Sequence, residues 1–133
     1  MELLTRRLCL ASHVGTKEVL FGGQMLAWAD IAASIWCMKL VQSDNLITVH
    51  MSDIDFLTPV RVGDLVEFYG EGYKIGRTSV TVRIRVMIHD PRTNVTTDAF
   101  RFVSVMVNID RNLRPKALPV NLQNTDNWGV EQE

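Results

Sequence analysis

A single carboxylate, Asp30, interrupts a stretch that is otherwise almost entirely apolar. The stretch begins at Gly22 and continues to about Val41, and its apolar residues recur at the spacing of a helix. A helix that is apolar on most sides belongs in a protein core, where an ionised carboxylate is costly unless it is paired or has a chemical role. Such a carboxylate can act as a general base or as a nucleophile. From the pattern alone, a structural carboxylate paired with an arginine is an equally good interpretation.

Two glycines, Gly22 and Gly23, open the same helix. A helix N-terminus offers unpaired N–H groups and the positive end of the helix dipole, and glycine lets a ligand come close to them. We therefore interpret Gly22 and Gly23 as a candidate oxyanion site, with close helix packing as the alternative. Gly23 lies about 10 Å from Asp30 along the helix, whereas a reacting carbonyl must lie about 3 Å from both groups. Two antiparallel helices could satisfy both, which predicts a homodimer with two shared sites.

Other reactive residue types offer no rival site. Cys9 and Cys37 lack metal-ligand spacing, and we expect both to be buried thiols in a reducing compartment. Cys37 lies deep in the helix without a base nearby in sequence, so packing is the better interpretation of it than a nucleophile. His13 and His89 have no cysteine or histidine partner at ligand spacing, so we expect no metal site.

Composition excludes several classes of partner. The chain has 133 residues, of which 47% are hydrophobic, which suits one globular domain with a real core. The net charge of -1 gives no basic excess for nucleic acid. No apolar run approaches the ~20 residues that cross a bilayer, and no secretory signal is recognisable, so we expect a cytoplasmic protein without a membrane anchor.

The expected elements are one strand, one long helix and then four strands. This order predicts an α+β fold with an antiparallel sheet of about five strands curled around one long central helix. Residues 1–120 are expected to form a single domain, and residues 121–133 a polar, flexible tail in which Trp128 has no assigned role. Gly70 and Gly72 predict a bulge or a bend. The ranges expected for the elements are 3–10, 22–41, 46–56, 65–73, 80–89 and 98–109.

Four segments follow one another along the chain at 20–30, 53–64, 76–79 and 98–105, followed by Arg114-Pro115. Taken together and in this order, they resemble the hotdog-fold acyl-CoA thioesterases. The resemblance covers about residues 3–119, and its motifs are more specific in combination than singly. It implies the hotdog fold, a thioester substrate, Asp30 as the catalytic carboxylate, and dimers that often assemble further into hexamers as trimers of dimers. No cofactor is implied, because coenzyme A is part of the substrate and the product.

The same resemblance suggests where coenzyme A binds. Cations and hydroxyls suit its phosphates, although without the family the segment Arg77-Thr78-Ser79 is more often an ordinary turn exit. Arg61 is a further candidate for a phosphate contact. The residues that the resemblance places along the coenzyme A path are Val49, His50, Met51, Arg77, Thr78 and Ser79.

The sequence departs from the family at two positions before the helix. Gly15 stands where family members commonly carry an asparagine that assists the carboxylate, and Glu18 stands where a glycine is common. His13 is near enough in sequence to substitute for that asparagine.

The predicted function is hydrolysis of acyl-CoA to a free acid and coenzyme A. A non-catalytic acyl-CoA sensor is the alternative, favoured by the missing asparagine. An enoyl-thioester hydratase on the same fold is disfavoured, because that chemistry requires a histidine in the site and the helix offers Asp30 instead.

Overall fold

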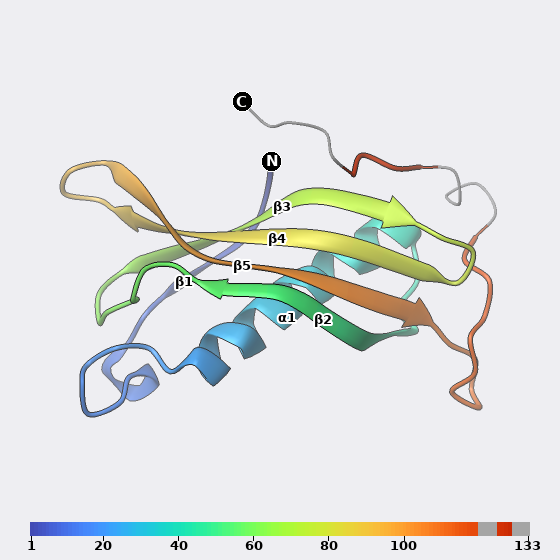
Figure 1. Ribbon diagram of the computed structural model, residues 1–133, viewed down its shortest axis with the longest axis horizontal. Helices are drawn as coiled ribbons and strands as arrows, with labels where there is room; N and C mark the ends of the chain where they lie inside the picture. The colour runs from blue at the N-terminus through green and yellow to red at the C-terminus, as the bar shows by residue number, and fades with distance from the viewer. Residues whose placement is uncertain (120–124, 129–133) are drawn as a thin grey trace.

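The computed structural model describes residues 1–119 and 125–128, and Figure 1 shows their arrangement. The predicted order of one strand, one helix and four strands is confirmed, and the helix and the strand that follows it have the predicted bounds. Most of the expected polar tail lies outside the described residues. The elements are β1 (Glu2–Leu8), a 3-10 turn (Ala11–His13), α1 (Gly22–Val41), β2 (Leu46–Phe56), β3 (Leu65–Ile75), β4 (Ser79–Asp90) and β5 (Val95–Asn108).

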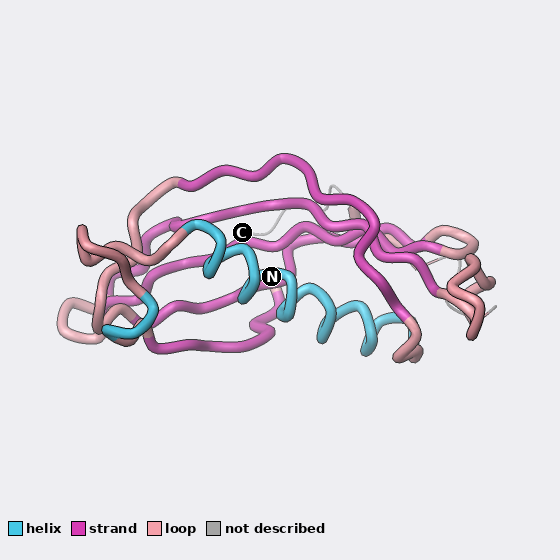
Figure 2. Tube along the Cα trace, turned by 90° about the horizontal axis from the view of Figure 1, so that it is seen from below, coloured by secondary structure: helices cyan, strands magenta, loops and turns pink. Residues whose placement is uncertain are grey.

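One antiparallel sheet contains all five strands in the order β1-β3-β4-β5-β2. Short turns join β3, β4 and β5 into a meander, while β1 and β2 form the two edges. The sheet arches over α1, which runs along its concave side (Figure 2). This is the predicted sheet curled around one central helix.

The helix α1 packs one face into the sheet and leaves part of its apolar surface bare. Its buried face includes Trp36, whose ring lies so close to Gly70 that a Cβ at residue 70 would come within 2.6 Å of it. The predicted bulge is present where β3 passes from Gly70 to Gly72. Although its sequence is apolar on most sides, α1 is not covered on every side in the single chain, because Ile31, Ile35 and Met38 form an exposed stripe at helical spacing.

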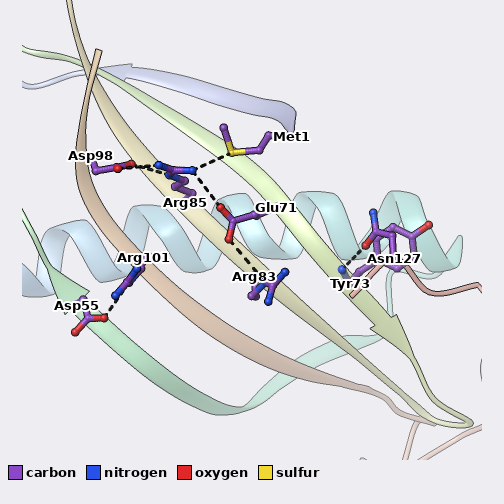
Figure 3. A network of polar contacts seen from close by, with 9 residues as sticks. All are labelled: Met1, Asp55, Glu71, Tyr73, Arg83, Arg85, Asp98, Arg101 and Asn127. Carbon is purple, nitrogen blue, oxygen red and sulfur yellow. Dashed lines mark hydrogen bonds and ion pairs between the residues drawn. The ribbon is translucent and has the colours of Figure 1, made fainter. Parts of the chain in front are cut away.

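The convex face of the sheet carries a row of ion pairs (Figure 3). Arg85 donates two hydrogen bonds to Asp98, at 2.6 and 2.7 Å, and a longer one to Glu71. The Arg85 guanidinium lowers the pKa of the Asp98 carboxyl, and the same pairing raises the pKa of Arg85. Asp98 therefore has a structural role within the motif that carried the family resemblance.

The outer edge of β3 has two different partners. β1 pairs with its first half, from Leu65 to Gly70. Beyond Gly70 the C-terminal segment takes over, because Asp126 forms a bridge with Lys74, and Asn127 exchanges two hydrogen bonds with Tyr73, at 2.6 and 3.1 Å (Figure 3). The ring of Trp128 then lies against Lys74 and Arg83, with its centroid 4.7 and 4.4 Å from their charged groups. These contacts give Trp128 a place in the fold.

Candidate functional site

Asp30 faces β2 from the middle of α1. The hydroxyl of Thr48 donates a hydrogen bond of 2.9 Å to Asp30 Oδ1. The side chain is half-buried, and within residues 1–119 and 125–128 no cation pairs with it. The interpretation of Asp30 as a structural carboxylate clamped by an arginine therefore has no support in the described part of the chain. What the fold supplies is a carboxylate with one oxygen oriented by a hydroxyl and the other available.

Thr48 is absent from the residues that the sequence suggested. Its neighbours Val49, His50 and Met51 were candidates, but Thr48 was read only as one β-branched residue in a strand. The bulge that β2 forms between Thr48 and His50 interrupts simple alternation of side chains at this point. One feature of the sequence could have indicated Thr48. It is a hydroxyl-bearing residue on the strand that packs against the face of the helix carrying Asp30.

The N-terminus of α1 presents two free amides. Phe21 precedes the helix and supplies no side-chain cap, while its carbonyl accepts from the N–H groups of Gln24 and Met25. Among the described residues, the N–H groups of Gly22 and Gly23 have no hydrogen-bond partner. No atom would lie within 4 Å of a Cβ at Gly23, so open space adjoins this amide. These are the properties of a site for a developing oxyanion.

Asp30 and the glycine pair are not brought together within one chain. Both belong to the same continuous helix, Gly22–Val41. At 1.5 Å per residue, Gly23 and Asp30 are separated by about 10 Å along its axis. One chain therefore contains the two halves of a candidate site at two places.

Cys37 lies close enough to Asp30 to feel its charge. Burial, with a smaller effect of the Asp30 carboxylate, raises the pKa of the Cys37 thiol to about 12. The thiol is therefore protonated at neutral pH and is not a nucleophile.

The loop before α1 differs in detail from the family expectation. A Cβ at Gly15 would lie 2.7 Å from the ring of Phe21, so that ring occupies the space into which an asparagine side chain would project. Glu18 adopts a left-handed backbone with φ of 57°, a conformation that favours glycine and explains why that residue is common there.

His13 does not stand in for the absent asparagine within the chain. Its Nδ1 accepts a hydrogen bond of 3.0 Å from the Leu10 N–H, and its ring packs edge-on against Trp28 at 4.9 Å between centroids. Trp28 and Asp30 are two residues apart on a helix, so they point in nearly opposite directions. His13 therefore lies on the side of α1 away from the carboxylate.

The candidate coenzyme A residues fall into two groups at opposite ends of the sheet. Thr78 lies in the turn between β3 and β4, and Ser79 is the first residue of β4. Both lie close to the start of β2, because they contact Asn108 and Val107 of β5, which pair with that end of β2. Arg61 lies in the loop after β2, at the other end of that strand, where it bridges to Val19. Figure 1 shows the two loops at opposite ends of the molecule.

The remaining candidates lie between these ends or beside Thr78. Val49, His50 and Met51 are in the middle of β2, and Val49 is 52% exposed. Arg77 is exposed, and its carbonyl accepts from the Leu118 N–H.

Two further features bear on what can bind. In the described part of the chain, no three His, Cys, Asp or Glu side chains are grouped so as to hold a metal ion. None of its helices has the length and hydropathy needed to span a membrane.

Comparison with known proteins identifies similar chains. Residues 17–95 match the family model described as the thioesterase superfamily. The chain is 30% identical over 126 residues to the acyl-CoA thioester hydrolase YciA of Escherichia coli strain K12, covering 90% of this chain and 92% of the relative. An uncharacterised acyl-CoA thioester hydrolase of Haemophilus influenzae is also 30% identical over 124 residues, covering 88% of this chain and 77% of the relative.

Solved structures share the fold. The hexameric thioesterase y2039 from Yersinia pestis superposes with a TM-score of 0.81 at 30% identity, covering 89% of this chain and 95% of that one. An acyl-CoA hydrolase from Staphylococcus aureus, solved with butyryl coenzyme A and coenzyme A, gives a TM-score of 0.78 at 26% identity, covering 86% of this chain and 70% of that one. The predicted hotdog fold is confirmed.

Proposed function

Because the chain belongs to the thioesterase superfamily, we propose that it hydrolyses acyl-CoA to a free acid and coenzyme A, with Asp30 as the catalytic carboxylate. The observation that carries this proposal is the Asp30–Thr48 pair on a helix whose N-terminal amides are free. A carboxylate and a set of oxyanion donors are the two groups that thioester hydrolysis needs.

The complete site requires two protomers. A carbonyl must lie about 3 Å from both the base and the oxyanion donors, and within one chain these are about 10 Å apart along α1. β2 is an edge strand, and an unpaired edge is a template for another strand. Antiparallel pairing of β2 with its copy makes the two helices antiparallel, which brings Gly23 of one protomer toward Asp30 of the partner subunit.

Exposed apolar side chains lie along the proposed dimer contact. On β2, Ile47, Val49 and Ile54 are 41, 52 and 39% exposed in the single chain. The helix stripe of Ile31, Ile35 and Met38 is exposed as well. Exposed apolar side chains on both β2 and α1 are typical of a protein interface and support the homodimer.

The reaction then follows from the geometry. The substrate carbonyl accepts from the Gly22 and Gly23 N–H groups, which stabilise the negative charge that develops on its oxygen. The partner's Asp30 either removes a proton from an attacking water or attacks the carbonyl carbon itself to form an acyl anhydride, which water hydrolyses. In both routes the carbon–sulfur bond breaks, the thiolate of coenzyme A leaves and takes up a proton, and the acid is released. Thr48 orients Asp30 throughout.

The same two-fold pairing would bring together the residues predicted to bind coenzyme A. Antiparallel β2 strands place the Thr78–Ser79 end of one protomer beside the Arg61 end of its partner. A path that starts at Arg77, Thr78 and Ser79, follows Val49–Met51 and ends at the partner's Arg61 would serve the extended ligand. We further propose that dimers assemble as trimers of dimers, by analogy with the hexameric y2039.

The test is release of free thiol from a panel of acyl-CoAs. Asp30→Asn should lower kcat by about 10²- to 10⁴-fold, the usual contribution of a general base. Asp44→Asn is the matched control, because Asp44 is the next acid along the chain and is exposed. Hydrolysis that survives Asp30→Asn would remove Asp30 from the mechanism, and tight binding of acyl-CoA by the wild type without turnover would favour the sensor.

A further inference from the structure

An apolar cavity of about 190 Å³ lies between the start of α1, the loop after β2 and the beginning of β5. Its deep wall is formed by Met25 and Ala99, which are 3% and 2% exposed. Thr58 is the one polar side chain among its lining residues. The other lining residues are Val19, Leu20, Gly22, Phe56, Leu57, Pro59 and Val60.

The cavity adjoins the free amides. Gly22 is part of its lining, and the ring of Phe56 lies so close to Gly22 that a Cβ there would be 3.1 Å from it. A ligand whose carbonyl accepts from the Gly22 and Gly23 N–H groups can therefore direct its next carbons into the cavity.

The two sides of the cavity differ in how they are held in place. The N–H groups of Leu57 and Thr58 both donate to the Ala99 carbonyl, at 2.8 and 3.2 Å, and so hold the loop against β5. Phe56 packs on Phe100 at 4.9 Å between ring centroids but remains 60% exposed. In the single chain, hydrogen bonds therefore hold the floor at Ala99, while the ring of Phe56 forms the open side at the end of β2.

We propose that this cavity binds the acyl chain of the substrate and that Ala99 and Phe56 set the chain length that it accepts. The inference rests on the proposed function, because it needs an acyl thioester whose carbonyl lies at Gly22 and Gly23. An almost wholly apolar lining matches an alkyl chain and excludes the charged and polar coenzyme A portion.

The volume gives the expected length. An apolar cavity of about 150 Å³ holds a benzene molecule, which has six carbon atoms. The present cavity is somewhat larger, so it accommodates an acyl chain of about six to eight carbons. Longer chains must displace Phe56 or remain outside.

Two substitutions test the proposal in opposite directions. The readout is the ratio of kcat/KM for octanoyl-CoA to that for acetyl-CoA, measured on the full-length assembled protein. Ala99→Leu fills the floor and should lower this ratio at least tenfold. Phe56→Ala opens the wall and should move the optimum from about C8 toward C12, because roughly a phenyl ring of space is added.

Matched controls lie outside the cavity. Ala117→Leu adds the same side chain at an exposed position, and Leu113→Ala removes an apolar side chain that is 71% exposed. Both should leave the ratio within twofold of the wild type. If both cavity variants hydrolyse acyl-CoA with an unchanged length profile, the cavity inference is wrong and the proposed function stands. If the wild type hydrolyses no acyl-CoA, the proposed function itself fails.

Discussion

The two ends of the sheet differ in how their strands are covered. The outer edges of β1 and β2 are both unpaired among the described residues, but β1 is the shorter strand, with 7 residues against 11 for β2. Along β3, β1 pairs as far as Gly70, and residues 126 and 127 continue on the same edge beyond it. Along β2, no strand within the described residues pairs with the outer edge. The polar and aromatic contacts of Trp128 secure the first edge, whereas apolar side chains are exposed along the second.

This difference supports the proposed assembly through β2. An unpaired strand edge invites pairing with another chain, and β2 offers the longer of the two unpaired edges, with exposed apolar side chains along it. The outer edge of β3, which β1 and residues 126 and 127 cover, lies in the half of the sheet remote from Asp30. The unpaired strand β2 carries Thr48, whose hydroxyl donates a hydrogen bond to Asp30. The edge through which we propose pairing is therefore the edge at which the proposed catalytic carboxylate, Asp30, lies.

A charge on the unpaired edge of β2 should have the largest effect on oligomeric state and activity. Val49→Lys should convert the protein to a monomer and lower hydrolysis by about 100-fold or more, because an unpaired charge buried at an interface costs about 3–5 kcal/mol. Light scattering gives the mass and thiol release gives the activity. Val95→Lys is the control, since Val95 is 56% exposed at the start of β5 and should change neither quantity. An active Val49→Lys monomer would contradict the shared site.

A smaller change on the same strand tests the link between the edge and the carboxylate. Thr48→Val keeps the side-chain shape but removes the hydrogen bond to Asp30, and should lower kcat by about tenfold or more, since a hydrogen bond to a charged group contributes about 1.5–3 kcal/mol. KM and the dimer mass should be unchanged, and Thr48→Ser should restore most of kcat. An effect on KM alone would contradict a positioning role.

Mutations in the segment that covers β3 should change the stability of the protein but not its oligomeric state. Trp128→Ala removes the contacts with Lys74 and Arg83 and should lower the free energy of unfolding by about 1 kcal/mol, as expected for cation–π contacts near the surface. Thermal unfolding measures this loss. The mass should stay that of the wild type, and a change in oligomeric state would show that this edge also takes part in assembly.

The Asp98–Arg85 pair, in the middle of the sheet, makes a pH-dependent contribution to the free energy of unfolding. Because the folded pKa of Asp98 is lowered, its contribution to stability is present above about pH 4 and is lost as pH falls through the folded pKa. Asp98→Asn should cost up to about 1 kcal/mol at pH 7, as for a partly exposed pair. The difference from wild type in urea unfolding should shrink below about pH 4, and a constant difference would contradict this role.

The sequence allowed most of the fold to be predicted, because its periodicity is unambiguous. β4 alternates cleanly from Val80 to Ile88, and α1 has the predicted bounds. Gly70 and Gly72 predicted the bulge. The contacts of residues 125–128 could not be predicted, since a short polar segment carries no periodic signal and its partner strand is distant in sequence.

The candidate site was predictable only in part. Asp30 and the two glycines were found because they break an apolar helical pattern, although their catalytic roles remain proposals. Thr48 and the cavity floor at Ala99 depend on packing between elements far apart in the chain, and a threonine or alanine in a strand has no distinctive spacing. The exposed stripe at Ile31 could not be separated from core residues by type.

The shared site can be tested directly by mixing two inactive variants. Asp30→Asn removes the carboxylate. Gly23→Pro removes one amide donor at a position where proline is tolerated, because the N–H groups of the first helical turn have no partner within the helix. Each homodimer should hydrolyse acyl-CoA about 100-fold or more slowly than the wild type.

Co-expression of the two variants should form mixed dimers in which one site has both its Gly23 and the partner's Asp30 intact. With random association, roughly a quarter of wild-type activity should return. Mixed dimers that form but remain as inactive as either parent would contradict a site built from both protomers.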